Sequence, residues 1–401
     1  MKALFLSQRI PYPPNKGEKL RTFHQIKFLI ECGMDITLFT PVEDDDIESI
    51  NKFSEIYDVD IYHDFLSHKL FRYLSGFILN KPLSISNFYL KKLQVKLDQY
   101  LLKSSYDAII CTSSSMAEYI FKSEVLTTSQ SKPILIMDFM DLDSDKWLQY
   151  AQTANWSIKW VYKREARLLA QYERRVEQEF DHCFFISQNE IDLYLKRNGS
   201  ANNIHVLGNG INTDEFFPAQ SSPSNLAPVL IFTGVMDYKP NVDAILWFVK
   251  NAWPLIHDHF PDSIFIIAGM NPISSIQNLN GKSGIKVTGF VEEILPYYHQ
   301  ADYFVAPFTI ARGVQNKVLQ AFACGLPVIS SSMGAEGIDC HDEKHFILAH
   351  TGQDYLDAII KLESTPDFRS SITENALTLI REQYSWESQL KTLKDIFYEC
   401  H

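Results

Sequence analysis

Short apolar runs alternate with helical stretches along this whole sequence, and the alternation limits the folds open to it. In the first half, strands are predicted at residues 3–7, 36–41, 59–62, 108–111, 134–138, 183–187 and 204–207. Helical stretches lie between most of these runs, and the clearest covers residues 157–180. Runs of this length with helices between them are typical of βαβ units and of a mostly parallel sheet covered on both faces.

The alternation stops once, at residues 218–228, and then begins again. This segment holds three prolines with serines and an asparagine, so it predicts a linker. Strands are then predicted at residues 229–233, 264–268, 285–288, 303–307, 327–330 and 346–348, and helices at 242–250, 314–324, 353–362 and 367–383. We therefore predict an α/β protein with two doubly wound Rossmann-like domains, residues 1–217 and 229–384. Ligands of such sheets bind beyond the carboxyl ends of the strands, and two facing domains form a cleft.

Charge and cysteine spacing disfavour several functions. The 401 residues carry a net charge of −12, which argues against general nucleic-acid binding. The six cysteines include no CxxC pair, so no disulfide framework or zinc site is suggested and a reducing cytoplasm fits. The apolar start is too short for a signal-peptide core, and no apolar run approaches the length of about 18 residues that a membrane span needs. We expect a cytoplasmic protein whose membrane contact is at most peripheral.

A basic loop follows the first predicted strand. Lys16, Gly17, Lys19 and Arg21 lie close together there, beside a predicted helix start that favours anions. The loop either closes on a phosphate or an acceptor, or it is a solvated basic turn. It matches neither the dinucleotide-binding nor the P-loop glycine pattern.

Four carboxylates follow the fifth predicted strand, within residues 138–145. An EF-hand calcium loop would need a glycine and a distant glutamate, and both are missing, so we predict no metal site. A carboxylate of this cluster, Asp138 or Asp141, is expected to face a substrate hydroxyl as the catalytic group. Helix capping and solvation are the alternative roles.

The strongest candidate site lies at residues 307–330, where a predicted strand ends in a loop and a helix follows. Asn316 and Gln320 are four residues apart, and Lys317 and Gln320 are three apart, so one helical face presents a cation and two amides. An amphipathic helix with its polar side chains in water is the alternative. Together with the turn after residues 229–233, the candidate donor-binding residues are Gly234, Asp237, Tyr238, Lys239, Arg312, Gly313, Val314, Gln315, Asn316 and Lys317. A plain β–α turn remains the other interpretation of the first four.

Residues 312–328 resemble a motif of the retaining glycosyltransferases of the GT-B group, family four: Glu-Gly-Phe-Gly-x-x-x-x-Glu-Ala-Met-Ala-x-Gly-x-Pro-Val. Residues 209–216 look like that family's hinge signature, Asn-Gly-Val-Asp-x-x-x-Phe. Gly289, Phe290 and Val291 are similar to its base-binding turn.

Other segments extend the resemblance. Residues 384–386 resemble the start of the family's last helix, which implies that residues 385–401 cross back to the N-terminal domain. Residues 13–21, 143–147 and 312–317 look like sugar transferases tied to bacterial exopolysaccharide and PEP-CTERM/exosortase systems.

This resemblance implies transfer of a sugar from a nucleoside diphosphate sugar to a hydroxyl of a glycan or lipid-linked glycan, in exopolysaccharide or other surface-glycan biosynthesis. It also implies retention of anomeric configuration, with no metal and no cofactor besides the donor. Two motif glutamates, which contact the donor sugar and hold the ribose, are Arg312 and Gln320 here, and the pyrophosphate-binding arginine is Val235. Arg312 and Lys317 are then expected to bind the pyrophosphate, and Gln320 the ribose. A sugar-nucleotide epimerase and a non-catalytic binding homologue remain alternatives.

A membrane-facing surface is predicted at residues 70–93. Large apolar side chains are interspersed there with Arg72, Lys81, Lys91 and Lys92, and the segment contains no acid. Rings in the headgroup region and cations on anionic lipid are what an interfacial surface needs. The alternative is that the apolar residues pack on the N-terminal sheet and the lysines are solvated.

Overall fold

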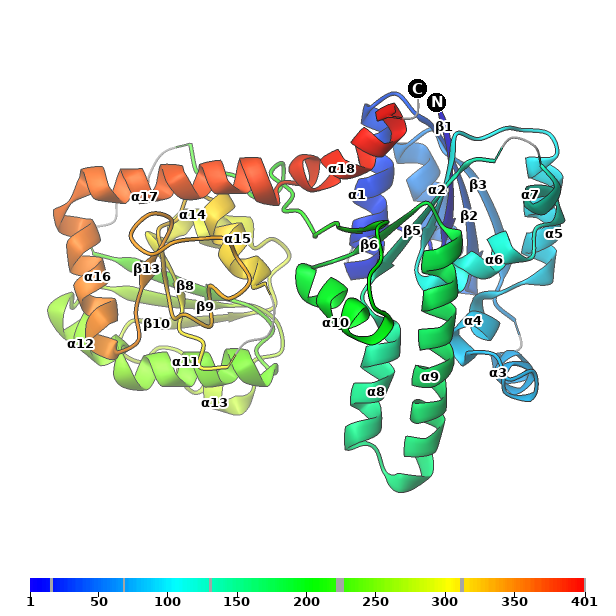
Figure 1. Ribbon diagram of the computed structural model, residues 1–401. Helices are drawn as coiled ribbons and strands as arrows, with labels where there is room; N and C mark the ends of the chain where they lie inside the picture. Colours follow the sequence, from blue (N-terminus) through cyan, green and yellow to red (C-terminus); the bar gives the residue numbers. More distant parts are fainter. Residues whose placement is uncertain (15–16, 68, 130–131, 221–226, 311–313, 400–401) are drawn as a thin grey trace. The chain divides into compact units, whose positions relative to one another are not determined.

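The computed structural model describes residues 1–401 apart from 15–16, 68, 130–131, 221–226, 311–313 and 400–401. The chain divides into two compact units, which are Met1–Asn209 with Gln389–His401, and Gly210–Ser388. Within each unit a parallel sheet has helices on both of its faces (Figure 1). The prediction of an α/β protein with two Rossmann-like domains is therefore confirmed.

The first unit is built on a seven-stranded parallel sheet in the order β3-β2-β1-β4-β5-β6-β7. Its strands are β1 (Lys2–Ser7), β2 (Asp35–Val42), β3 (Asp60–Phe65), β4 (Ala108–Thr112), β5 (Ile134–Met140), β6 (His182–Phe185) and β7 (Ile204–Val206). Its helices are α1 (Gly17–Glu31), η1 (Asp44–Asp46), α2 (Ile47–Ile56), α3 (Lys69–Ile78), α4 (Leu83–Phe88), α5 (Lys91–Leu101), η2 (Ser114–Met116), α6 (Ala117–Phe121), α7 (Glu124–Thr128), α8 (Asp143–Thr153), α9 (Trp156–Glu179) and α10 (Gln188–Asn198). Strand β4 is buried at every residue, because helices cover both faces of the sheet.

The second unit has a six-stranded parallel sheet in the order β10-β9-β8-β11-β12-β13. Its strands are β8 (Val229–Thr233), β9 (Ile264–Ala268), β10 (Ile285–Gly289), β11 (Tyr303–Ala306), β12 (Val328–Ser330) and β13 (Ile347–Leu348). Its helices are α11 (Lys239–Asn251), α12 (Trp253–His259), α13 (Ser274–Gln277), α14 (Leu295–Gln300), α15 (Asn316–Ala323), α16 (Gly352–Ser364), α17 (Pro366–Leu379) and the π-helix η3 (Ile380–Tyr384), while α18 (Trp386–Glu399) starts in this unit and ends in the first.

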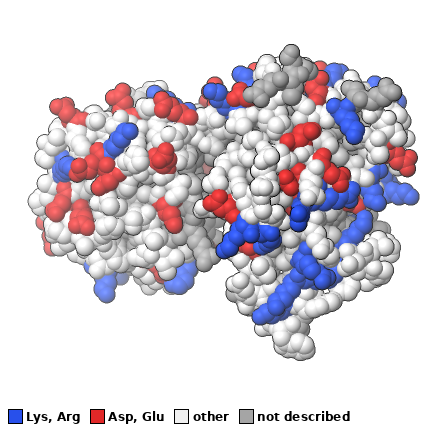
Figure 2. Space-filling model, in the orientation of Figure 1, with Lys and Arg blue, Asp and Glu red and all other residues white. Residues whose placement is uncertain are grey.

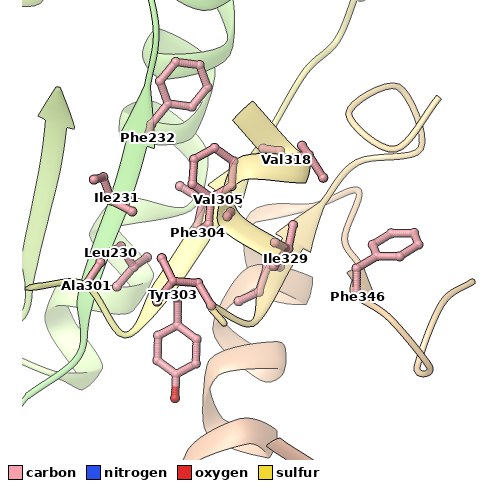
Figure 3. Packing of buried hydrophobic residues seen from close by; sticks show 14 of the residues in the cluster. Leu230, Ile231, Phe232, Ala301, Tyr303, Phe304, Val305, Val318, Ile329 and Phe346 are labelled. Atoms are coloured by element: carbon pink, nitrogen blue, oxygen red, sulfur yellow. The ribbon is translucent and has the colours of Figure 1, made fainter. Parts of the chain in front are cut away.

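The core of the second unit lies where β8, β11 and α15 meet. Phe232 and Phe304 stack with their ring centroids 6.4 Å apart, and Val318 of α15 is buried with them in one apolar cluster (Figure 3). This packing holds α15 against the sheet, which determines where the polar side chains at the start of that helix lie.

The division between the units differs from the predicted linker at residues 218–228. The first unit ends at Asn209, because Ile211 and Phe216 are already buried in the core of the second unit. The chain returns to the first unit at Gln389, within α18, and not at the predicted residue 385.

Two helix starts also differ from the prediction. Helix α11 begins at Lys239 instead of residue 242, and Pro240 lies in its first turn, where a missing backbone N–H costs no helical hydrogen bond. Helix α15 begins at Asn316, so Val314 and Gln315 precede it. Among the described residues, no helix is long and apolar enough to cross a membrane.

Candidate functional site

A polar cluster forms at the carboxyl end of β8, where the first turns of α11 and α15 meet. Asn241 of α11 is 3% exposed, and its Nδ2 donates a hydrogen bond to the carbonyl oxygen of Val235 at 2.8 Å. Its Oδ1 accepts one from Lys317 Nζ at 2.6 Å. Gly234 has a φ of +153°, which favours glycine, and a Cβ there would lie 2.7 Å from Asn241 Nδ2 and 3.0 Å from Lys317 Nζ, so a side chain would displace these two groups. The three residues Gly234, Asn241 and Lys317 are called the donor cluster below.

Lys317 is a cation without an acidic partner among the described residues. Its ammonium lies 4.9 Å from the ring centroid of Phe232 and 5.0 Å from that of Phe308, and both rings favour the charged form. Burial acts in the opposite direction and lowers the pKa of Lys317 to about 8. In the described part of the chain Asn241 is its one hydrogen-bond acceptor, so the ammonium retains two N–H donors for a ligand.

Gln320, one turn further along α15, is oriented by a buried tyrosine. The Tyr298 hydroxyl donates to Gln320 Oε1 at 3.2 Å and lies 2.8 Å from Thr233 Oγ1. Burial raises the pKa of Tyr298 well above its usual range, so the hydroxyl stays a donor at any physiological pH. Neither Tyr298 nor Asn241 was predicted, because their role depends on contacts between segments far apart in the sequence.

The other donor-binding residues predicted from the sequence lie outside these contacts or outside the described residues. Lys239 pairs with Asp243 at 2.7 Å on the surface of α11, and Asp237 accepts a hydrogen bond from Asn271 at 3.3 Å. Tyr238, Val314 and Asn316 are exposed, and Gln315 immediately precedes α15. Arg312 and Gly313 lie outside the described residues. At the end of β10, Gly289 takes a φ of +69°, Phe290 is exposed and Val291 is half-buried.

In the first unit, Asp138 is enclosed by hydrogen-bond donors. It is 1% exposed, and the Arg21 guanidinium binds both of its oxygens, with Nε 2.6 Å from Oδ2 and Nη2 2.9 Å from Oδ1. Gln25 Nε2 also donates to Oδ2 at 2.5 Å, and the Met140 backbone N–H to Oδ1 at 3.2 Å. A carboxylate bound in this way holds Arg21 in place, so Asp141, which is half-buried, is the more accessible member of the predicted catalytic pair.

A cavity of about 210 Å³ opens beside this ion pair, at the carboxyl ends of β1, β4 and β5. Asp141 lines it and is bound by Lys146 at 2.5 Å. Met140 and Ser113, which line it from the ends of β5 and β4, have φ values of +64° and +76°, which non-glycine residues rarely adopt. The other residues that line it include Gln8, Arg9, Gly17, Lys19, Arg21, Thr112, Asp143 and Asn209.

The predicted basic loop contributes to this cavity in part. Gly17 begins α1, and Lys19 lies 3.8 Å from Asp46, while Lys16 is outside the described residues.

Burial raises the pKa of Asp143, which also lines the cavity. The described residues contain no group of three His, Cys, Asp or Glu side chains that could hold a metal ion.

Two parallel α/β units, each with polar side chains gathered beyond the carboxyl ends of its strands, define the GT-B fold. Solved structures with this fold superimpose on nearly the whole chain. Anabaena HepE in complex with UDP superimposes with a TM-score of 0.65 at 15% identity, covering 100% of both chains. WaaG, a glycosyltransferase involved in lipopolysaccharide biosynthesis, gives a TM-score of 0.59 at 14% identity, covering 98% of this chain and 99% of that one.

Residues 227–364, in the second unit, match the family model of the glycosyl transferases group 1. The chain is also 23% identical to an uncharacterized 44.6 kDa protein in the cps region of Klebsiella pneumoniae, over 99% of both chains. It is 26% identical to the D-inositol 3-phosphate glycosyltransferase of Saccharomonospora viridis over 33% of this chain and 32% of that protein. These similarities support glycosyl transfer as the activity.

Proposed function

We propose that this protein transfers a sugar from a nucleoside diphosphate sugar to a hydroxyl group of a glycan or lipid-linked glycan. The observation that carries the proposal is the donor cluster. It presents the half-buried ammonium of Lys317, which has no carboxylate within 4 Å among the described residues, beside a backbone turn kept open by Gly234. A diphosphate fits this cluster, because it supplies the negative charge and the acceptor oxygens that the ammonium lacks.

The donor cluster suits the charge that develops during transfer. As the glycosidic bond to the diphosphate breaks, negative charge grows on the departing diphosphate. A cation already held in place by Asn241 stabilises that charge without reorganisation. We propose that Arg312, which lies outside the described residues, shares this role with Lys317. Gln320, with its oxygen held by Tyr298, is proposed to bind the ribose, and the exposed ring of Phe290 to bind the base.

On the acceptor side, we propose that the cavity of the first unit holds the acceptor hydroxyl, with Asp141 as the carboxylate that faces it. Asp138 is proposed to act by positioning Arg21, since its own oxygens are occupied. The reaction then needs no covalent nucleophile and no metal, and we propose that the sugar keeps its anomeric configuration.

The biological setting we propose is surface-glycan synthesis at the cytoplasmic face of a membrane. A relative over 99% of its length comes from a cps region, and solved neighbours include TarM with an α-GlcNAc-glycerol and UDP, and HepE with UDP-glucose. The sequence resemblance to exopolysaccharide sugar transferases supports the same setting.

Calorimetry with UDP, GDP, uridine and guanosine, followed by an assay of donor consumption with and without glycan acceptors, tests the proposal. We expect one nucleoside diphosphate to bind far more tightly than its nucleoside, and the donor sugar to appear on an acceptor. Binding without turnover would point to a non-catalytic homologue. Formation of an isomerised sugar nucleotide without any acceptor would point to an epimerase.

A further inference from the structure

Helix α3 exposes the apolar side chains that an amphipathic helix would normally bury. Leu70, Phe71 and Ile78 are 86%, 72% and 72% exposed, and Leu74 is also exposed. Leu70, Leu74 and Ile78 follow one another at intervals of four residues, so they form one face of the helix. Folding of the first unit leaves this face uncovered, which is uncommon for a contiguous apolar surface.

A second apolar group, from a distant part of the chain, adjoins this face. Trp156 and Trp160, in the first turns of α9, are 88% and 60% exposed. The ring of Trp160 lies 5.7 Å from that of Phe77 at the end of α3. Arg164 of α9 joins the two helices, because it donates a hydrogen bond to the Gly76 carbonyl oxygen at 3.4 Å and lies over the Phe77 ring. The exposed apolar side chains of residues 70–79 with Trp156 and Trp160 are called the tip surface below.

The segments that form the tip surface are rich in cations, although the protein as a whole is acidic. Segments 69–81 and 156–167 contain seven Lys and Arg and one acid, Glu165, which is buried, while the whole chain has a net charge of −12. Lys69, Lys163 and Arg167 are exposed. In Figure 2 the lower end of this unit, where α3, α8 and α9 lie, shows mainly uncharged and blue side chains, and the red ones lie mostly above it.

We propose that the tip surface docks on an anionic lipid bilayer. The indole rings and the α3 side chains would enter the headgroup region, where amphipathic rings are favoured, and the surrounding cations would meet lipid phosphates. A bilayer accepts protruding side chains without a complementary shape, whereas a protein partner needs a matched surface. Pairing with a second copy through the tip surface would bring the cations of the two copies close together, and their repulsion opposes such a dimer.

This surface differs from the one predicted from the sequence. In residues 70–93, Phe88 and Tyr89 are half-buried against the unit, so the apolar part of the surface ends near residue 79. The rest of the surface is formed by Trp156 and Trp160, which were not predicted, and not by residues 80–93. The docking proposal is independent of the sugar transfer, because the tip surface shares no residue with the donor cluster or with the 210 Å³ cavity.

Vesicle flotation of the full chain tests the proposal, with phosphatidylcholine vesicles compared with vesicles that also contain phosphatidylglycerol. We expect binding to the anionic vesicles only, weakened by salt because the attraction is screened. The variant Lys159→Glu/Lys163→Glu should bind at least tenfold more weakly, since each cation near the surface is worth roughly fivefold in partitioning. The variant Trp156→Ser/Trp160→Ser should also bind at least tenfold more weakly, because it removes two rings that would enter the headgroup region.

Control variants make comparable changes elsewhere on the first unit. Leu102→Ser removes an exposed apolar side chain, and Lys103→Glu/Lys122→Glu reverses two exposed lysines outside the tip surface. All variants should keep the unfolding temperature and the UDP affinity of the wild type. A failure of the proposed function would therefore appear in UDP binding, separately from any loss of vesicle binding. Absence of binding to anionic vesicles at low salt, or equal losses in tip and control variants, would overturn the proposal. So would a dimer in sedimentation velocity that the tryptophan variant abolishes, because the surface would then join two copies.

Discussion

Binding of a nucleoside diphosphate should take up a proton near pH 8, with Lys317 as the group that becomes charged. Burial lowers the pKa of Lys317 to about 8 in the free protein. A diphosphate beside the ammonium would favour its charged form and raise that pKa. At pH 8 about half of the free molecules carry the charge and nearly all complexes do, so binding should take up about half a proton. The diphosphate itself contributes little, because its last ionisation has a pKa of about 6.

The affinity should follow the same equilibrium. If only the protonated form binds, the dissociation constant rises about tenfold between pH 7 and pH 9, which is about 1.4 kcal/mol. Binding should weaken as the pH rises, because the protonated Lys317 that binds the diphosphate is present below its pKa of about 8 and is lost as the pH rises through that value.

Isothermal titration calorimetry with UDP or GDP, in buffers of different ionisation enthalpy, measures the proton uptake directly. Lys317→Met should weaken diphosphate binding and abolish both the uptake and the pH dependence. Lys250→Met, which removes an exposed lysine at the other end of α11, should leave both unchanged. Wild-type binding at pH 8 without proton uptake, or the same uptake in Lys317→Met, would refute this assignment of Lys317.

Three further predictions concern stability, the donor cluster and metals. Asp138→Ala should lower the free energy of unfolding by about 3–5 kcal/mol in urea, because Arg21 would remain buried without its partner; a loss below 1 kcal/mol would contradict the ion pair. Gly234→Ala should weaken UDP or GDP binding at least tenfold, since its Cβ would lie 2.7 Å from Asn241 Nδ2, whereas Gly281→Ala, also at positive φ but in open space, should not. Transferase activity should survive EDTA, and a strict requirement for magnesium or manganese that titration restores would disprove metal independence.

Much of the donor cluster could be predicted, because its main residues lie in continuous segments. Lys317 and Gln320 share a helical face through local spacing, and Gly234 follows a recognisable strand. Their partners could not be predicted. The lysine meets Asn241, which is 76 residues away, and Gln320 meets Tyr298, which is 22 residues away. Lys239 stays a prediction as a ligand residue, and the ion pair that it forms with Asp243 on the surface of α11 could not be told from its position in the turn.

The sequence by itself determined the two-domain α/β architecture of this protein. Each predicted strand corresponds to a strand of one of the two sheets, because the apolar runs and the breaks between them are properties of adjacent residues. Only the tertiary structure decided what the charged and aromatic residues do. Asp138 is saturated by Arg21 from 117 residues away, and Trp160 joins Phe77 in an exposed surface. The burial and pairing of a side chain depend on which distant segments pack together. The periodicity within one segment does not indicate which other segments it will contact.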